Sequence, residues 1–154
     1  MHPNAERVQT ALDELRIGTK VVELEGSART VAEAATSIGT IEACILKSLI
    51  FEAGGEPLLV IMSGCNRVST EKVSRIVGKT VRRPDADFVR RTTGFPIGGV
   101  PPVGLATPMR ILVDQDLLNH EVVWAAAGTW NAVFPTEPRR LVEVIHGEVQ
   151  DVRE

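Results

Sequence analysis

Cysteine and histidine are scarce in this sequence, which has two cysteines and three histidines among 154 residues. His2, His120 and His146 are scattered along the chain and lack the short ligand spacing of a zinc site. Cys44 and Cys65 also lack a short metal-binding or redox spacing, so we expect reduced structural thiols, the first in a strand and the second in a turn. The sequence therefore predicts no metal site and no cofactor.

Long apolar runs and common catalytic motifs are also missing. No apolar run reaches the roughly 18 residues of a membrane-spanning helix, and the opening MHPNAERVQT lacks the apolar stretch of a secretory signal. We therefore expect a cytoplasmic protein that makes no membrane contact. The sequence contains no GxSxG elbow, no P-loop and no Rossmann fingerprint, which argues against serine-hydrolase and common nucleotide-binding chemistries.

The overall composition is that of an ordinary globular protein, with 44% hydrophobic and 24% charged residues. A chain of 154 residues can bury a core without disulfides or metal, so we expect one domain spanning residues 1–154. Apolar residues at helical spacing and end signals predict five helices, over residues 4–15, 30–39, 69–78, 85–94 and 137–147. The expected N-caps are Thr30, Ser69 and Asp85, and the expected terminators are Gly39, Gly78 and Gly94.

About seven strands are predicted between these helices, and they do not alternate strictly with them. Residues 44–64 form two apolar runs separated by Gly54 and Gly55, which indicates a hairpin with a loop longer than two residues. Further strands are expected within 20–24, 109–114, 121–128, 131–136 and 148–152. Because hairpins dominate, we predict an α+β (mixed α/β) domain with a curved, largely antiparallel mixed sheet and flanking helices.

Positive charge is concentrated in one segment. Arg67–Arg91 contains eight basic and three acidic residues, whereas the rest of the chain contains nine basic and seventeen acidic residues. Such a patch on an acidic body fits brief contact with a polyanion at one face, and it equally fits solvated helix surfaces.

The stretch TTGFPIGGVPPVG, residues 92–104, holds four glycines and three prolines and no charged residue. Glycine and proline together specify an irregular but defined backbone path. The stretch is either a tight crossover between two elements or a wall of backbone amides facing a small polar ligand. In the second case Gly98, Gly99 and Val100 keep N–H donors, whereas Pro101 and Pro102 have none.

A lysine interrupts the strand CILKSLIF. Both faces of this strand are mostly apolar, which predicts a central strand buried on both sides. An unpaired ammonium is costly to bury, so Lys47 either extends its head group past a sheet edge or faces a pocket whose ligand is an anion such as a phosphate. Combined with the uncharged amide loop, the second alternative suits an anionic or ester-like substrate.

Four stretches in order, RTVAEAATSIGT, CILKSLIF, TGFPIGGVPPVG and WAAAGTWNAVF, together with the closing helix, resemble the YbaK/ProX family of free-standing aminoacyl-tRNA editing domains. The resemblance spans roughly residues 5 to 152. It implies a mixed α/β fold similar to the insertion domain of bacterial prolyl-tRNA synthetase. It also implies hydrolysis of the ester between a wrong amino acid and tRNA, without a metal or a protein nucleophile. The implied partners are the acceptor end of an aminoacyl-tRNA and an aminoacyl-tRNA synthetase.

The resemblance assigns roles to individual positions. Lys47 matches the strand lysine that holds the phosphate next to the terminal adenosine. GGVPP, from Gly98 to Pro102, matches the GxxxP loop that binds the aminoacyl carbonyl and positions water, while a ribose hydroxyl of the substrate assists the attack. We expect the catalytic residues to be Lys47, Gly98, Gly99 and Val100, and the substrate-binding residues to be Phe95, Ile97, Pro101, Pro102, Gly128 and Thr129. If the substrate is a tRNA, the basic segment 67–91 is expected to be an auxiliary contact for it, through Arg82 and Arg83.

The chain departs from the family pattern at two places. Many members have serine where Pro101 stands, and the turn GTWNA carries the bulky Trp130 and the polar Asn131. Pocket walls discriminate substrates by size and by unpaired polar groups, so these changes bear on which amino acid is accepted. They also leave an alternative function, a non-catalytic module that binds a nucleotide or an aminoacyl-tRNA in the same pocket.

Overall fold

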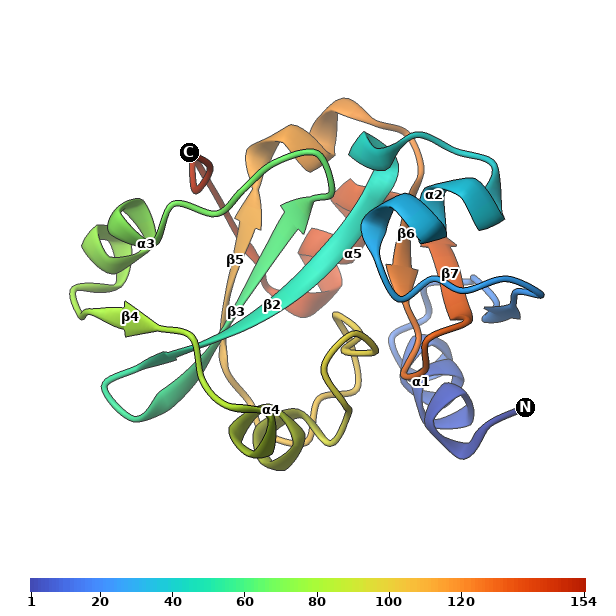
Figure 1. Cartoon of the computed structure of the whole chain (residues 1–154), viewed down its shortest axis with the longest axis horizontal. Helices are drawn as coiled ribbons and strands as arrows, with labels where there is room; N and C mark the ends of the chain where they lie inside the picture. The colour runs from blue at the N-terminus through green and yellow to red at the C-terminus, as the bar shows by residue number, and fades with distance from the viewer.

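The computed structural model describes all 154 residues, which form a curved mixed sheet with helices on both faces (Figure 1). The strands follow the order β1-β7-β6-β2-β3-β5-β8, and β4 pairs with β2 outside this path. Four strand pairings are antiparallel and three are parallel. The strands are β1 (Val22–Glu23), β2 (Ile45–Ala53), β3 (Glu56–Ser63), β4 (Val81–Arg82), β5 (Arg110–Asp114), β6 (Val123–Ala126), β7 (Ala132–Thr136) and β8 (Glu148–Gln150). The predicted fold class is confirmed.

Five α-helices and two short 3-10 helices connect the strands. They are α1 (Pro3–Glu14), α2 (Val31–Ile38), η1 (Glu42–Cys44), α3 (Thr70–Val77), α4 (Ala86–Thr93), η2 (Gln115–Asn119) and α5 (Pro138–Ile145). None of the helices is long and apolar enough to cross a membrane.

The three predicted pairs of helix caps are all present. The side chains of Thr30, Ser69 and Asp85 accept hydrogen bonds from the backbone N–H groups three residues later, at 3.1, 3.2 and 2.8 Å. Each of these helices ends at a glycine with left-handed backbone angles, namely Gly39, Gly78 and Gly94. Capping residues thus define α2, α3 and α4.

The β2–β3 hairpin corrects one prediction about its loop. Ala53 pairs with Glu56, so the turn contains only Gly54 and Gly55, and both have positive φ angles of 60° and 85°. This is the backbone geometry of the tightest hairpin turns, which side chains other than glycine adopt at a cost. The prediction of a longer loop was wrong because strand pairing continues beyond the apolar runs, through Glu52 and Ala53 on one side and Glu56 and Pro57 on the other.

Two local predictions were also incomplete. Cys44 does not lie in a strand; it ends the 3-10 helix η1, immediately before β2. The strand β4 and the two 3-10 helices were not predicted, because segments of two to five residues carry too little periodicity to be recognised.

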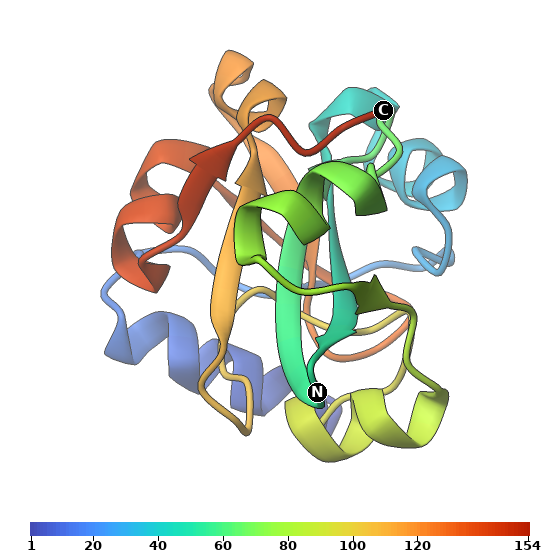
Figure 2. The same ribbon diagram turned by 90° about the vertical axis from the view of Figure 1, so that its left-hand side faces the viewer.

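Two apolar cores lie on opposite faces of the sheet. The larger one joins α1, α5 and the 95–103 loop to alternate residues of β2 and β3, with Leu12, Leu59 and Phe134 completely buried. The smaller one lies under α3, around Val60, Met62 and Val73. Figure 2 shows α3 in front of the central strands. Strand β2 therefore has apolar packing on both faces, as its sequence predicted.

One edge of β2 is paired only at its two ends. Along the other edge, β3 pairs with β2 over its whole length. The first edge pairs with β6 at Ile45 and Leu46, and with β4 at Glu52 and Ala53. The stretch 47–51 between these pairings has a free edge. This gap in the sheet is where the cavity described below opens.

Candidate functional site

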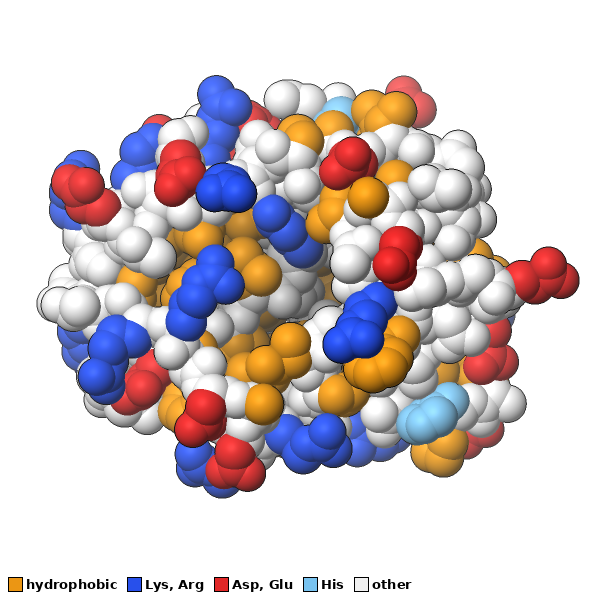
Figure 3. Space-filling view, in the orientation of Figure 1, with side chains coloured by type: hydrophobic (Ala, Val, Ile, Leu, Met, Phe, Trp, Pro, Cys, Tyr) orange, Lys and Arg blue, Asp and Glu red, His pale blue; other side chains and the backbone are white.

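A cavity of about 420 Å³ lies against the free edge of β2. Most of the residues that line it are apolar, and they come from α2, β2, β6 and the 97–100 loop. Its charged lining residues are Arg29, Lys47 and Arg83, and no acidic residue or histidine lines it. In Figure 3 the hollow has a hydrophobic floor, and Lys and Arg side chains stand around its rim. The cavity is thus built for an anionic or neutral ligand with a small apolar part.

Lys47 lies on this cavity without a partner. Its ammonium makes no ion pair or hydrogen bond in the structure, which distinguishes it from the paired Lys72. Burial lowers the pKa of Lys47 from its ordinary value, and the nearby Arg67 and Arg83 lower it further. The charges of Cys65 and Asp114 act in the opposite direction but do not outweigh these effects. An unpaired, partly desolvated cation of this kind is a place where an anion gains the most by binding.

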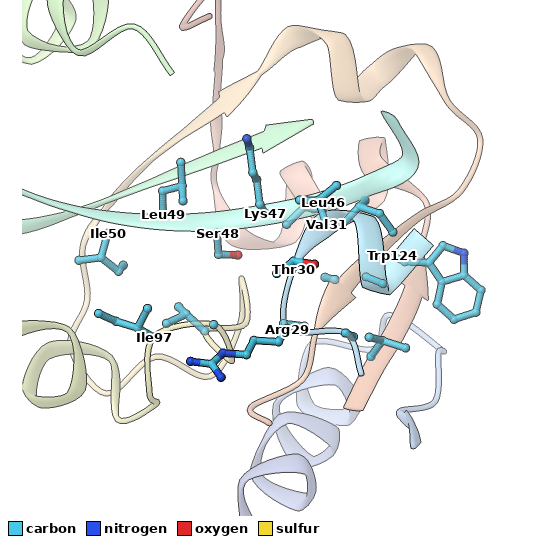
Figure 4. A pocket seen from close by; sticks show the side chains of 18 of the residues that line it. Arg29, Thr30, Val31, Leu46, Lys47, Ser48, Leu49, Ile50, Ile97 and Trp124 are labelled. Atoms are coloured by element: carbon cyan, nitrogen blue, oxygen red, sulfur yellow. The ribbon is translucent and has the colours of Figure 1, made fainter. Parts of the chain in front are cut away.

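The two faces of β2 contribute to different parts of the cavity. Figure 4 shows the Lys47 and Leu49 side chains on one side of the strand, and Ser48 on the other side, toward Thr30 and Ile97. Residues from both sides of β2 line the cavity because no strand pairs with the edge between them.

The two neighbouring arginines predicted as tRNA contacts have different environments. Arg83 lines the cavity, with its guanidinium 6.0 Å from the centroid of the Phe51 ring. Arg82 points to the surface, where it pairs with Glu52 at 3.2 Å. Only the first of the two adds positive charge to the cavity rim.

The 96–100 loop forms a tight turn at the cavity wall. Gly99 donates its N–H to the carbonyl of Pro96 at 3.0 Å, and Gly98 has a φ of 87°, which favours glycine. The Gly99 N–H, expected to be free for a ligand, is therefore used within the turn. The N–H groups of Gly98 and Val100 donate to no acceptor in the chain.

The orientation of these two free N–H groups follows from the neighbouring carbonyls. The Ile97 carbonyl accepts from the Trp130 indole N–H at 3.4 Å, and the Gly99 carbonyl accepts from the Gly128 N–H at 2.9 Å. In a trans peptide the N–H points opposite to the carbonyl. The Gly98 and Val100 N–H groups therefore point away from the 128–130 turn, and both residues line the cavity.

The loop and the 128–130 turn touch closely. A side chain at Gly99 would come within 3.0 Å of the Gly128 carbonyl group, and one at Gly128 would come within 2.9 Å of Asn4. Arg29 stacks 4.1 Å from the Trp130 ring and covers the turn from the cavity side. The glycines at these positions allow three segments that are distant in sequence to form one wall.

The remaining predicted residues lie behind or beside this wall. Phe95 is completely buried in the larger core, and Pro101 and Pro102 are buried beneath the loop. Gly128 and Thr129 line a second, open hollow of about 530 Å³ on the other side of Trp130. The structure thus brings Lys47, Arg83, Ile97, Gly98 and Val100 together around one cavity, and it places Phe95, Gly99, Pro101, Pro102, Gly128, Thr129 and Arg82 outside its lining.

Sequence reasoning missed two features of the cavity. The first is the part of the lining formed by Arg29 and by Val31 and Ala34 of α2. The amphipathic pattern of residues 30–39 could have indicated the two residues on the helix. The second is Ser48, a polar residue inside an apolar strand face whose hydroxyl is buried and has no hydrogen-bond partner. No three His, Cys, Asp or Glu side chains lie close enough together to hold a metal ion.

Comparisons with known proteins agree with this architecture. A family profile described as aminoacyl-tRNA editing domain matches residues 25–144. Protein YwhH of Bacillus subtilis strain 168 is 32% identical over 130 residues, which are 84% of this chain and 83% of that protein. The proline–tRNA ligase of Streptococcus equi subsp. zooepidemicus is 28% identical over 150 residues, which are 94% of this chain but only 23% of the ligase.

Two solved structures share this fold. A crystal structure described as "a putative trans-editing enzyme for prolyl tRNA synthetase" superposes with a TM-score of 0.95 at 43% identity, over 100% of this chain and 99% of that one. Hypothetical protein APE2540 superposes with a TM-score of 0.90 at 34% identity, over 96% and 99% of the two chains. The resemblance to YbaK-type domains is confirmed, and the chain belongs to the aminoacyl-tRNA editing domain family.

Proposed function

We propose that this protein is a trans-editing hydrolase that removes an incorrect amino acid from the acceptor end of a mischarged tRNA. The observation that carries the proposal is the cavity itself, which is lined by the unpaired Lys47 and by two residues with free backbone N–H groups, Gly98 and Val100, and which has no acidic lining residue. The similarity to a trans-editing enzyme for prolyl-tRNA synthetase, and to part of the proline–tRNA ligases, makes mischarged proline tRNA the first substrate to test.

The proposed chemistry uses orientation and charge rather than a protein nucleophile. Lys47, supported by Arg83, holds the phosphate next to the terminal adenosine. The Gly98 and Val100 N–H groups bind the ester carbonyl and stabilise the negative charge that develops on its oxygen. An aminoacyl ester is reactive enough that positioning and oxyanion stabilisation account for useful rate enhancement.

The water that attacks the ester needs a base, and the cavity lining offers no carboxylate or imidazole. We assign this role to the neighbouring ribose hydroxyl of the substrate. The water oxygen bonds to the carbonyl carbon while the water passes one proton to this hydroxyl. The hydroxyl passes its own proton to the ester ribose oxygen, and the bond from the carbonyl carbon to that oxygen breaks, so the ribose oxygen leaves as a hydroxyl. The products are the free amino acid and the uncharged tRNA.

The test is deacylation of proline tRNA charged with a panel of amino acids. We expect cleavage above the spontaneous rate, and we expect Lys47→Ala to lower kcat/KM at least about tenfold because a charge-assisted phosphate contact is lost. Lys20→Ala, which removes an exposed lysine outside the cavity, is the control and should leave the rate unchanged. If no ester is cleaved, the hydrolase proposal is wrong; if Lys47→Ala cleaves at full rate, only the role of Lys47 is wrong.

The alternative is a non-catalytic module that binds the same group. It is favoured by the use of the Gly99 N–H within the turn, which leaves two rather than three loop donors for the carbonyl. It is also favoured by Pro101, which has no N–H to add. Such a module would bind a non-hydrolysable aminoacyl-adenosine and would leave every charged tRNA in the panel intact.

A further inference from the structure

Ser48 carries the one buried side-chain oxygen or nitrogen in the chain that has no hydrogen-bond partner. Its residue lines the cavity, and in Figure 4 its side chain points to the same side of β2 as Thr30 and Ile97. A buried hydroxyl without a partner costs free energy, and folded proteins leave few of them. An unpaired group at a cavity wall is satisfied when a ligand supplies the partner.

The backbone of Ser48 is also free on the cavity side. In an antiparallel pair, alternate residues direct their N–H and C=O groups to the partner strand. The two-residue turn after Ala53 and the 2.7 Å bond from the Gly64 N–H to the Ile45 carbonyl show that odd-numbered residues of β2 bond to β3. The even-numbered Ser48 and Ile50 therefore direct their backbone groups toward the gap between β6 and β4, where no strand pairs with them.

We propose that Ser48 determines which amino acid is cleaved, and that the cavity prefers a small acyl group with a hydroxyl on its side chain. This inference rests on the proposed hydrolase function and adds the chemistry of its substrate. The Ser48 hydroxyl exchanges hydrogen bonds with the substrate hydroxyl, and the free edge of β2 holds the α-amino group through its carbonyls.

The partner of the Ser48 hydroxyl is a side-chain hydroxyl rather than the α-ammonium. An ammonium can donate but cannot accept, so it would leave the Ser48 O–H proton unpaired. A hydroxyl can both donate and accept, and it satisfies the serine completely.

The walls around Ser48 are aliphatic, so the substrate hydroxyl, rather than the size of the acyl side chain, should decide the preference. The neighbouring residues on its strand face are Leu46 and Ile50, and Val100 and Ala125 also line the cavity. Aliphatic walls discriminate against an added methylene only weakly, whereas a site that hydrogen-bonds a substrate hydroxyl rejects the analogue that lacks it more strongly. The preference should therefore be clearest between side chains of similar size that differ in the hydroxyl.

The experiment compares the same proline tRNA charged with serine or alanine, and with threonine or the isosteric valine. We expect the wild type to have a higher kcat/KM on the seryl ester than on the alanyl ester by about tenfold or more. Ser48→Ala should remove most of this difference by slowing seryl-ester cleavage, with the alanyl ester serving as the internal control. Ser48→Thr keeps the hydroxyl and should keep the preference.

A second measurement is independent of turnover. Because Ser48→Ala removes an unpartnered buried hydroxyl, we expect it to raise the Tm of the free protein. The inference is overturned if esters are cleaved but the seryl-to-alanyl ratio is the same in the wild type and Ser48→Ala, or if the wild type prefers the alanyl ester. That result would leave the hydrolase proposal standing, whereas absence of all cleavage would remove both.

Discussion

At the residue scale, Lys47 is maintained at a cost to stability. The chain places an ammonium on a strand that is apolar on both faces and gives it no ion pair, although the charge of Asp114 favours the protonated form. A structural lysine would be paired or fully exposed, as Lys72 is paired with Asp151 at 2.9 Å. The cost is compensated only when an anion occupies the cavity. Replacing Lys47 should therefore raise the stability of the free protein and lower its activity.

The first prediction is that Lys47→Met is more stable than the wild type and less active. Methionine keeps the length of the side chain and removes the partly desolvated charge. Because solvent still screens this half-exposed ammonium, we expect a gain of only about 0.5 kcal/mol in the free energy of unfolding. Urea denaturation at neutral pH measures this gain. A clear loss of stability would show that Lys47 has a favourable partner in the free protein.

The stability gained by Lys47→Met should depend on pH. Burial lowers the pKa of Lys47 below its ordinary value of 10.5, so the unfolded chain binds this proton more tightly than the folded chain. Between the lowered pKa and 10.5 the lysine's contribution to the free energy of unfolding therefore rises with pH, and below the lowered pKa its cost is fully present. The stability difference between Lys47→Met and the wild type should narrow as the pH is raised through this window, and parallel curves would contradict the prediction.

At the element scale, the 96–100 loop depends on glycine for reasons that the sequence only partly contained. Gly98 needs its positive φ for the turn and has the Trp130 indole 3.3 Å from where a side chain would begin. This turn fixes the direction of the free N–H groups at the cavity. The loop is thus a shaped element whose far side is held by the 128–130 turn.

We therefore predict that Gly98→Ala lowers kcat/KM by about tenfold or more, because the wall that binds the carbonyl moves. It should also cost about 1 kcal/mol of stability, since alanine is strained at this φ. Gly55→Ala is the matched control, because Gly55 has a φ of 85° and open space around it at the hairpin tip. It should lose similar stability and keep full activity; equal losses of activity in both variants would show that the effect of Gly98→Ala is general destabilisation.

Local signals were enough to predict the five helices and most strands, but not how these elements pack against one another. Thr30, Ser69 and Asp85 cap their helices through contacts three residues away, so a sequence window contains the whole interaction. The contact between Gly99 and Gly128, and the stacking of Arg29 on Trp130, join segments that no local window contains.

Of the candidate site, the sequence predicted the residues with an unusual local pattern, but not which of their neighbours reach the cavity. Lys47 interrupts an apolar strand and Gly98 belongs to an uncharged stretch rich in glycine and proline, and both residues lie on the cavity. Phe95 and Pro101 were named because they share a motif with Gly98, and the structure buries them behind the wall. Ser48 was missed because a single serine in a strand is unremarkable until the neighbouring strand edge is known to be free.

At the scale of the whole molecule, charge is unevenly distributed. The chain has a net charge of −3, yet the cavity rim carries Arg29, Lys47 and Arg83 and no acid. Figure 3 shows this cationic rim on one face of the protein. Such a field attracts a polyanion to one place and orients it, while the acidic remainder limits non-specific binding elsewhere.

The final prediction uses two adjacent arginines whose replacement changes the net charge equally. Arg83→Gln removes a charge that lines the cavity, so it should weaken tRNA binding and reduce the slope of log Kd against log salt concentration by roughly one. Arg82→Gln removes a charge that is already paired with Glu52, so its effect on affinity and on the slope should be smaller. Equilibrium binding at several salt concentrations measures both. Identical effects of the two variants would mean that tRNA responds only to the overall positive charge of residues 67–91, and the cavity rim would then not be the place where the acceptor end is held.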